Sequence, residues 1–168
     1  VAGDRDSDTA VVAFTSWARP SELWRWQGGH EGVERWSALP SPVDPDRYTV
    51  GVDTYPSTDG TTVTLFTVGR DGAAAGPTTP TVLTGYGGFA VTMSPAYSPS
   101  AVAVADAGGV FAVACIRGGS EQGEDWHRAG MREQKQQVFD DFTAAADWLV
   151  ASGRTSRERL AVRGGSNG

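Results

Sequence analysis

The feature that most constrains the fold is the glycine-rich segment 163–168, which directly follows a short apolar run at 160–162. Within it, Gly164 and Gly168 stand two residues on either side of Ser166. Glycines at this spacing let a strand and a following helix approach closely, and they allow the central serine a strained backbone that lifts its hydroxyl out of the turn. The segment therefore predicts a sharp turn after a buried strand, in a sheet flanked by helices.

This GxSxG pattern is typical of the strand-to-helix turn that carries the nucleophile in hydrolases of the α/β type. Ser166 is then the candidate nucleophile, and the backbone N–H of Asn167 would point at the oxyanion that develops during attack. The alternative is an ordinary Gly/Ser-rich turn, because the chain has 22 glycines among 168 residues. The context favours the nucleophile, since an apolar strand ends in the motif and an amphipathic helix precedes that strand.

That helix has the clearest periodicity in the chain. Apolar residues recur at helical spacing from Val138 to Val150, and Gly153 is the expected C-cap. The predicted apolar face consists of Val138, Phe139, Phe142, Ala145, Ala146, Leu149 and Val150. Asp140, Asp141, Thr143 and Asp147 are predicted to face away, with the first two complementing the positive end of the helix dipole.

The remaining pattern predicts strands and helices in an α/β order. We expect strands at 10–14, 22–26, 48–55, 62–68, 81–84, 110–116 and 160–162, a second helix at 100–107, and a long polar loop at 117–136. The apolar strand at 110–116 should be buried on both faces of a parallel sheet. Residues 1–9 read as a loop, and the proline-rich segment 39–46 is a stiff connector that suggests a domain boundary. The predicted domains are therefore 1–43 and 44–168.

Composition excludes several classes of partner. The net charge of -6 and the pI near 4.8 argue against nucleic-acid or anionic-membrane binding, since no basic patch is available to neutralise phosphates. The single cysteine, Cys115, lies in an apolar run, so a buried structural thiol is expected. The chain begins at Val1 and stops inside the predicted turn, so we expect it to be an internal piece of a longer parent polypeptide.

Four linked motifs carry a family resemblance. In order and spacing they resemble those of prolyl oligopeptidases: Tyr86-Gly87-Gly88-Phe89; Ile116-Arg117-Gly118-Gly119-Ser120-Glu121 with Gly123 and Trp126-His127; Phe139-Asp140-Asp141-Phe142; and Gly164-Gly165-Ser166-Asn167-Gly168. The match covers nearly all of 45–168. Residues 1–40 resemble, more weakly, the closing strands of the β-propeller that caps these enzymes. The resemblance implies a β-hairpin remnant of a propeller followed by a partial α/β-hydrolase domain, truncated at the nucleophile elbow.

The resemblance also implies roles for individual residues. Ser166 matches the nucleophile, while Tyr86 matches the tyrosine whose hydroxyl completes the oxyanion hole with the backbone N–H of Asn167. Phe89 matches a residue that lines the proline pocket, with a plain core aromatic as the alternative. The catalytic aspartate and histidine of the family lie beyond Gly168. His30 and His127 are expected to be loop histidines, and no metal or organic cofactor is implied.

The resulting hypothesis is a cytoplasmic, monomeric serine oligopeptidase that hydrolyses short peptides, after proline, through an acyl-enzyme on Ser166. An acylaminoacyl peptidase or esterase of the same class is the nearer alternative. Dinucleotide binding is a more distant alternative. It is raised by Gly85, Gly87 and Ala90, which fit GxGxx[GA], and by Asp106, which follows about twenty residues later. A third alternative is a non-catalytic interaction module, since the 168 residues alone lack the triad Asp and His and are expected to be inactive and prone to aggregate.

Overall fold

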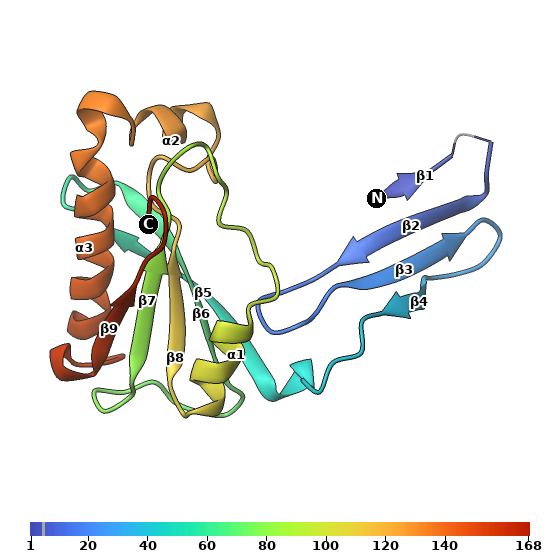
Figure 1. Ribbon diagram of the computed structural model, residues 1–168, viewed down its shortest axis with the longest axis horizontal. Coiled ribbons are helices and arrows are strands. Elements are labelled where there is room, and N and C mark those ends of the chain that lie inside the picture. The colour runs from blue at the N-terminus through green and yellow to red at the C-terminus, as the bar shows by residue number, and fades with distance from the viewer. Residues whose placement is uncertain (5) are drawn as a thin grey trace.

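The computed structural model describes residues 1–4 and 6–168, which form two β-sheets joined by an irregular connector (Figure 1). The first sheet has the strand order β1-β2-β3-β4 and the second β5-β6-β8-β7-β9. The strands are β1 (Ala2–Gly3), β2 (Thr9–Phe14), β3 (Glu22–Gln27), β4 (Glu34–Ala38), β5 (Tyr48–Pro56), β6 (Thr62–Arg70), β7 (Thr81–Gly85), β8 (Val110–Ala114) and β9 (Leu160–Arg163).

The N-terminal sheet contains the predicted hairpin and extends it. β2 and β3 pair antiparallel, as expected, but β1 and β4 add a strand at each edge. The prediction of a loop over 1–9 was therefore wrong at Ala2–Gly3 and at Thr9, and its residue 5 lies outside the described residues. β4 escaped detection because all five of its residues are exposed, so it carries no buried face that an alternating pattern could reveal.

The second sheet confirms the predicted α/β arrangement. β5 and β6 form an antiparallel hairpin, β6 pairs antiparallel with β8, and β7 pairs parallel with both β8 and β9. The strand that leads to Ser166 is thus an edge strand beside β7. Because β7 and β9 run parallel, their carboxyl ends meet at one edge of the sheet.

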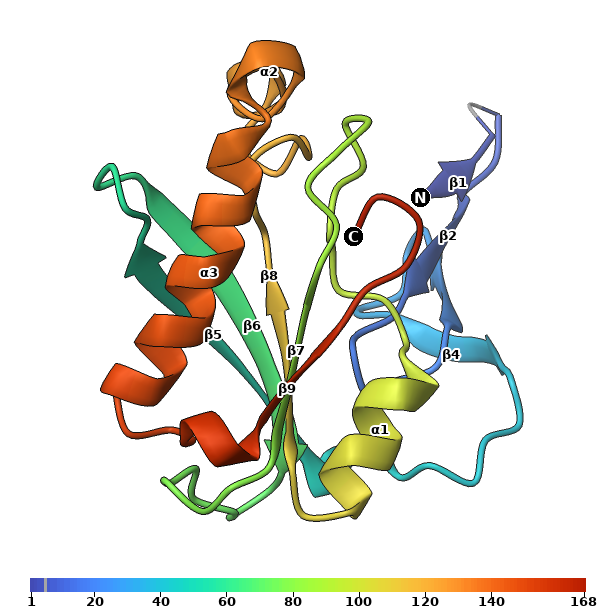
Figure 2. The same ribbon diagram turned by 60° about the vertical axis from the view of Figure 1, so that its left-hand side comes forward.

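Helices cover the two faces of this sheet, α1 (Pro99–Asp106) on one and α3 (Gln136–Ala151) on the other (Figure 2). Each face has its own core. Along β8, Ala112 and Ala114 belong to the core that includes α3, whereas Phe111 and Val113 belong to the core that includes α1. The strand is thus buried on both faces, as its uninterrupted apolar sequence predicted. Trp17 and Ala18, between β2 and β3, join the α1 core and link the N-terminal sheet to it.

The predicted face of α3 was wrong at two positions. Asp141, expected to face solvent, is completely buried, and Phe139, expected in the core, is 53% exposed. The physical reason is a partner distant in sequence, because Arg117 ion-pairs with the buried Asp141 carboxylate. The buried positions Val138, Asp141, Ala145 and Leu149 recur at three- and four-residue spacing, which leaves position 139 on the flank.

The segment predicted as a polar loop, 117–136, contains the short helix α2 (Glu124–Arg128) and a 3₁₀ turn at Arg132–Gln134. Trp126 of α2 is buried against the core under α3. Two further 3₁₀ turns, Pro45–Arg47 and Arg157–Arg159, precede β5 and β9. The segment after β8 is therefore an ordered structure packed on the α3 side of the sheet rather than a free loop.

Candidate active site

The site is built where β7 and β9 end. Leu83 pairs with Val162 and Thr84 with Arg163, so the residues that follow these strands leave the sheet side by side. Tyr86 comes directly after β7, and Ser166 lies in the turn after β9. Figure 2 shows this C-terminal turn next to the loop that follows β7. Two segments about eighty residues apart in sequence thereby share one corner of the sheet.

Ser166 has a left-handed backbone, with φ of 55°, and is exposed. A non-glycine residue rarely adopts this conformation, and its appearance here matches the strain expected of a nucleophile turn. The flanking glycines are required by close approach. A Cβ at Gly164 would lie 2.5 Å from the carbonyl oxygen of Gly168, and one at Gly168 would collide with the carbonyl oxygen of Gly85.

The side chain of Asn167 ties the turn to the loop after β7. Its Nδ2 donates a hydrogen bond to the backbone carbonyl of Tyr86, and its Oδ1 accepts one from Lys135 Nζ at 3.1 Å. Lys135 Nζ also donates to the carbonyl of Gly87 at 2.9 Å. The predicted residues Tyr86 and Asn167 are thus in direct contact. Lys135, which the sequence analysis did not single out, connects Asn167 with Gly87, the residue after Tyr86.

Phe89 is not a core aromatic, because 76% of its surface is exposed. It has a positive φ of 53° and lines a hollow of about 480 Å³ together with Gly88, Gly118, His127, Gly130, Met131, Arg132, Lys135 and Asn167. Among the described residues, Phe89 thus belongs to neither of the two cores. A second hollow, of about 270 Å³, lies between α3 and the C-terminal turn, with Tyr86, Phe139, Phe142, Val162 and Asn167 among its lining residues.

His30 lies in a turn, as expected, whereas the expectation of a loop was wrong for His127, which belongs to the short helix α2. His127 is partly buried, and its Nδ1 lies 2.8 Å from the carbonyl oxygen of Gly118, the geometry of an N–H donated to that oxygen. This contact ties α2 to Gly118, near the start of the same segment after β8. His30 is exposed in the turn between β3 and β4, within the N-terminal sheet.

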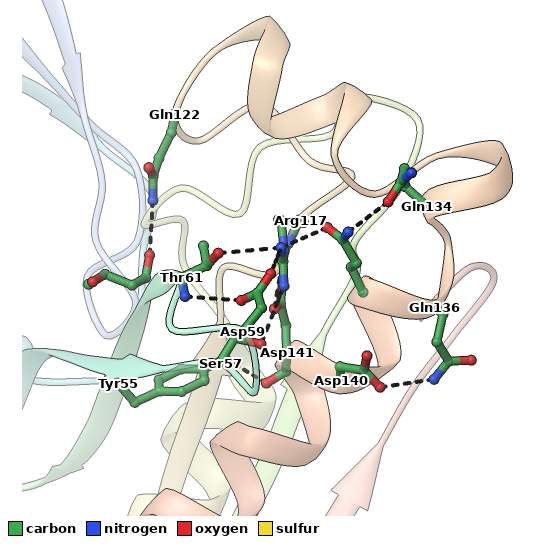
Figure 3. A network of polar contacts seen from close by, with 12 residues as sticks. Tyr55, Ser57, Asp59, Thr61, Arg117, Gln122, Gln134, Gln136, Asp140 and Asp141 are labelled. Carbon is green, nitrogen blue, oxygen red and sulfur yellow. Dashed lines mark hydrogen bonds and ion pairs between the residues drawn. The ribbon is translucent and has the colours of Figure 1, made fainter.

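Arg117, in the segment after β8, forms a buried ion pair with Asp141 of α3 (Figure 3). The Arg117 guanidinium donates to both carboxylate oxygens of Asp141, through Nη2 at 2.6 Å and Nε at 2.9 Å, and its Nη1 donates to Asp59 at 2.6 Å. These bonds raise the pKa of Arg117 further above its usual range, while its guanidinium lowers the pKa of Asp59. The network joins the β5–β6 turn, the segment after β8 and α3.

Cys115 confirms the expectation of a buried structural thiol. It is 2% exposed and follows β8, and burial, with a smaller contribution from the nearby Glu121 carboxylate, raises its pKa to about 12. At neutral pH the thiol is therefore protonated and a poor nucleophile.

The dinucleotide alternative loses its structural basis. No helix follows Gly85-Tyr86-Gly87 directly, because residues 86–98 contain no helix and α1 begins only at Pro99. Asp106 accepts a hydrogen bond from the Tyr48 hydroxyl and pairs with Arg70. Without a helix N-terminus behind the glycines, the segment lacks the pyrophosphate-binding element of such sites.

Among residues 1–4 and 6–168, no three His, Cys, Asp or Glu side chains gather in a group that could hold a metal ion. Across the same ranges, none of the helices combines the length and apolar character needed to cross a bilayer.

A parallel strand that ends in a left-handed serine between two close-packed glycines, within a mixed sheet covered by helices on both faces, defines the chain as part of an α/β-hydrolase fold. Comparison with protein families matches residues 95–168 to "Prolyl oligopeptidase family".

Curated relatives extend this match over the whole chain. The chain is 40% identical over 173 aligned residues to "Prolyl oligopeptidase ophP" of Omphalotus olearius, covering 100% of this chain and 23% of the relative. It is 32% identical to "Prolyl endopeptidase" of Elizabethkingia miricola, covering 99% of this chain and 24% of the relative. The chain thus spans about a quarter of the length of the curated relatives it matches.

Solved structures agree in fold. A structure from a study of two prolyl endopeptidases superposes with a TM-score of 0.90 at 43% identity, covering 99% of this chain and 25% of that one. A structure of prolyl oligopeptidase B from Galerina marginata, bound to a 25mer macrocyclization substrate, gives a TM-score of 0.90 at 31% identity over 98% of this chain and 24% of that one. From end to end, the chain is therefore similar to members of the prolyl oligopeptidase family.

Proposed function

We propose that the full-length protein is a serine oligopeptidase that hydrolyses short peptides on the carboxyl side of proline. Ser166 is the nucleophile in this proposal, and the Tyr86 hydroxyl and the Asn167 backbone N–H form the oxyanion hole. The observation that carries it is the corner of the sheet at which β7 and β9 end. There a serine with φ of 55° is followed by an asparagine whose side chain is bonded to the carbonyl of Tyr86.

The reaction follows from this arrangement. Ser166 Oγ attacks the peptide carbonyl while its proton passes to a general base, and the carbonyl oxygen becomes an oxyanion that accepts hydrogen bonds from the two donors. The C–N bond then breaks, the amine leaves with a proton, and water hydrolyses the acyl-enzyme. Neither histidine of this chain is assigned as the base, because His127 of α2 is bonded to the carbonyl of Gly118 and His30 lies in the N-terminal sheet.

Preference for proline rests on Phe89 in this proposal. Its exposed ring lines the same hollow as Asn167, and there it can pack against the pyrrolidine ring of a proline in a bound peptide. The relatives named as prolyl oligopeptidases and endopeptidases support the same preference. We further propose a propeller-derived domain over 1–43 and a peptidase domain from 44, in a monomeric, cytoplasmic parent protein.

The test is the Ser166→Ala variant of the full-length protein. It should lose both acyl-enzyme formation and covalent labelling by a fluorophosphonate, because the attacking oxygen is gone. Ser152→Ala is a matched control, since Ser152 sits at the C-cap of α3 and donates to the carbonyl of Leu149. Peptide turnover that survives Ser166→Ala would overturn the assignment. Comparing proline-containing peptide amides with simple esters would separate the peptidase from the esterase alternative.

A further inference from the structure

Two segments must be aligned for the proposed oxyanion hole to work. One donor, the Tyr86 hydroxyl, comes from the loop after β7, and the other, the Asn167 N–H, from the turn after β9. Donors must lie within about 3 Å of one developing oxygen to stabilise it. The β7–β9 ladder ends at the Thr84–Arg163 pair, so it does not itself fix the relative position of the two segments that follow.

Lys135 supplies the contact that reaches both segments. Its Nζ donates to the carbonyl of Gly87 at 2.9 Å and to Asn167 Oδ1 at 3.1 Å, while Asn167 Nδ2 donates to the carbonyl of Tyr86. The ammonium, the asparagine amide and the 86–87 backbone thus form a closed set of hydrogen bonds. Gly88 permits this closeness, because a Cβ there would lie 2.6 Å from Asn167 Nδ2.

Lys135 is itself held in place. It precedes the first residue of α3, the helix that is packed against the sheet, and its ammonium lies 5.7 Å from the centre of the Phe139 ring. Partial burial lowers the pKa of Lys135. None of the ion pairs among the described residues involves Lys135, and its ammonium donates hydrogen bonds to Gly87 and Asn167.

Composition adds an independent observation. Lys135 is the single lysine of the chain, beside thirteen arginines. A compact ammonium can donate from one nitrogen to two acceptors on different segments. The planar guanidinium of arginine instead presents its donors in a fixed fork. The position therefore suits lysine in particular.

We propose that Lys135 is a positioning residue, which through Gly87 and the Asn167 side chain aligns the Tyr86 hydroxyl and the Asn167 N–H on one oxyanion. This inference rests on the proposed function of Ser166, Tyr86 and Asn167. Lys135 does not touch the reacting atoms. It fixes the segments that carry the two donors, and so acts on the transition state more than on substrate binding.

The experiment uses the full-length protein with Lys135→Met, which keeps an unbranched apolar stem and removes the donors. Removal of a whole oxyanion donor costs about 100- to 1000-fold in kcat, and a displacement near 1 Å costs about 100-fold. We therefore expect kcat to fall about 10- to 100-fold with KM changed less than about threefold. Rates are divided by the concentration of sites that a fluorophosphonate titrates, so that a misfolded fraction does not count.

A second measurement separates alignment from general damage. A peptide aldehyde adds to the Ser166 hydroxyl, and its carbonyl oxygen then occupies the oxyanion position. Its affinity should fall by the same factor as kcat, while the affinity of the corresponding peptide alcohol, which forms no adduct, stays unchanged. Lys135→Arg should lie between wild type and Lys135→Met. Arg128→Met, at an exposed Arg128–Glu124 pair on α2, is the matched control and should behave as wild type.

A double variant tests the route. If Lys135 acts through the Asn167 side chain, Lys135→Met should cost less in an Asn167→Ala background than in wild type. An unchanged kcat, or equal losses of aldehyde and alcohol affinity, would overturn the inference and leave the proposed function standing. A wild-type protein that neither cleaves peptide amides nor labels at Ser166 would overturn both.

Discussion

At the scale of single residues, the glycines around Ser166 give the sharpest expectation. Gly164→Ala places a methyl group 2.5 Å from the carbonyl oxygen of Gly168, which is far inside van der Waals contact and meets backbone that cannot swing away. We expect a loss of about 1 to 3 kcal/mol in local stability and a collapse of fluorophosphonate labelling, because the turn must open. Intact mass after labelling of the full-length protein measures the second effect. Gly165→Ala is the matched control, since a Cβ there meets nothing within 4 Å, and a labelling rate equal for both variants would contradict the prediction.

Cys115 provides a second prediction at this scale. With its pKa raised to about 12, the thiol stays protonated at pH 8, and the side chain is 2% exposed. Iodoacetamide should therefore fail to modify Cys115 in the native protein and should modify it after unfolding in urea. Peptide mapping by mass spectrometry checks both states. Rapid alkylation of the native protein would show that β8 opens readily or that the thiol is activated.

Residue-level prediction from the sequence succeeded where a motif has local geometry. The spacing of Gly164, Ser166 and Gly168 predicts a sharp turn with a strained serine backbone. The positive φ of Ser166 and the close contacts at both glycines agree with that prediction. Lys135 could not be found in this way, because its function lies in acceptors 32 and 48 residues away, Asn167 and Gly87. The one available signal was that it is the single lysine of the chain.

At the scale of elements, the Arg117–Asp141 pair should determine how firmly α3 and the segment after β8 are held. Arg117→Met would leave the Asp141 carboxylate, which is 0% exposed, without its charged partner. We expect a loss of about 3 to 5 kcal/mol, because an uncompensated buried charge is strongly unfavourable. Hydrogen exchange of the α3 amides in the full-length protein, together with urea unfolding, measures the effect.

The double variant Arg117→Met with Asp141→Leu distinguishes charge from packing. It should recover part of the lost stability, since apolar groups of similar volume often replace a buried pair without loss. Arg157→Met is the surface control, because the Arg157–Asp147 pair joins α3 to the turn before β9 with both side chains exposed. That variant should change stability by less than about 1 kcal/mol. A double variant no more stable than Arg117→Met would mean that Asp141 is not the source of the loss.

This element also shows where pattern reading fails. Helical periodicity located α3 to within two residues of its start and end, since seven apolar positions repeat over it. It misplaced Asp141 and Phe139 because binary patterning treats every carboxylate as a surface group. Only the fold brings Arg117, 24 residues earlier, opposite that carboxylate. Both partners lie in motifs that carry the family resemblance, Arg117 in one and Asp141 in another. Nothing in the local sequence of either motif indicated that the two residues form a pair.

At the scale of the whole molecule, the sequence predicted the order of the layers better than their edges. Strands buried on both faces, such as β8, have long apolar runs and were recovered. The edge strands β1 and β4 of the N-terminal sheet were missed, because all of their residues are exposed and neither strand carries an apolar run.

The free edge of β9 leads to the last prediction, which concerns the 168-residue chain expressed by itself. Three of its four residues are exposed, and Val162 is 66% exposed beside unpaired backbone groups. The opposite edge strand, β5, ends in Pro56 and carries Asp53 bound to Arg154, features that oppose strand pairing. We therefore expect the chain alone to be catalytically inactive and to self-associate through β9. Val162→Lys should raise the monomer fraction in size-exclusion chromatography with light scattering, because a charged edge disfavours pairing with a second copy. Val33→Lys adds the same charge at an exposed position outside every strand, so an equal gain from both variants would show that net charge, not the β9 edge, controls association.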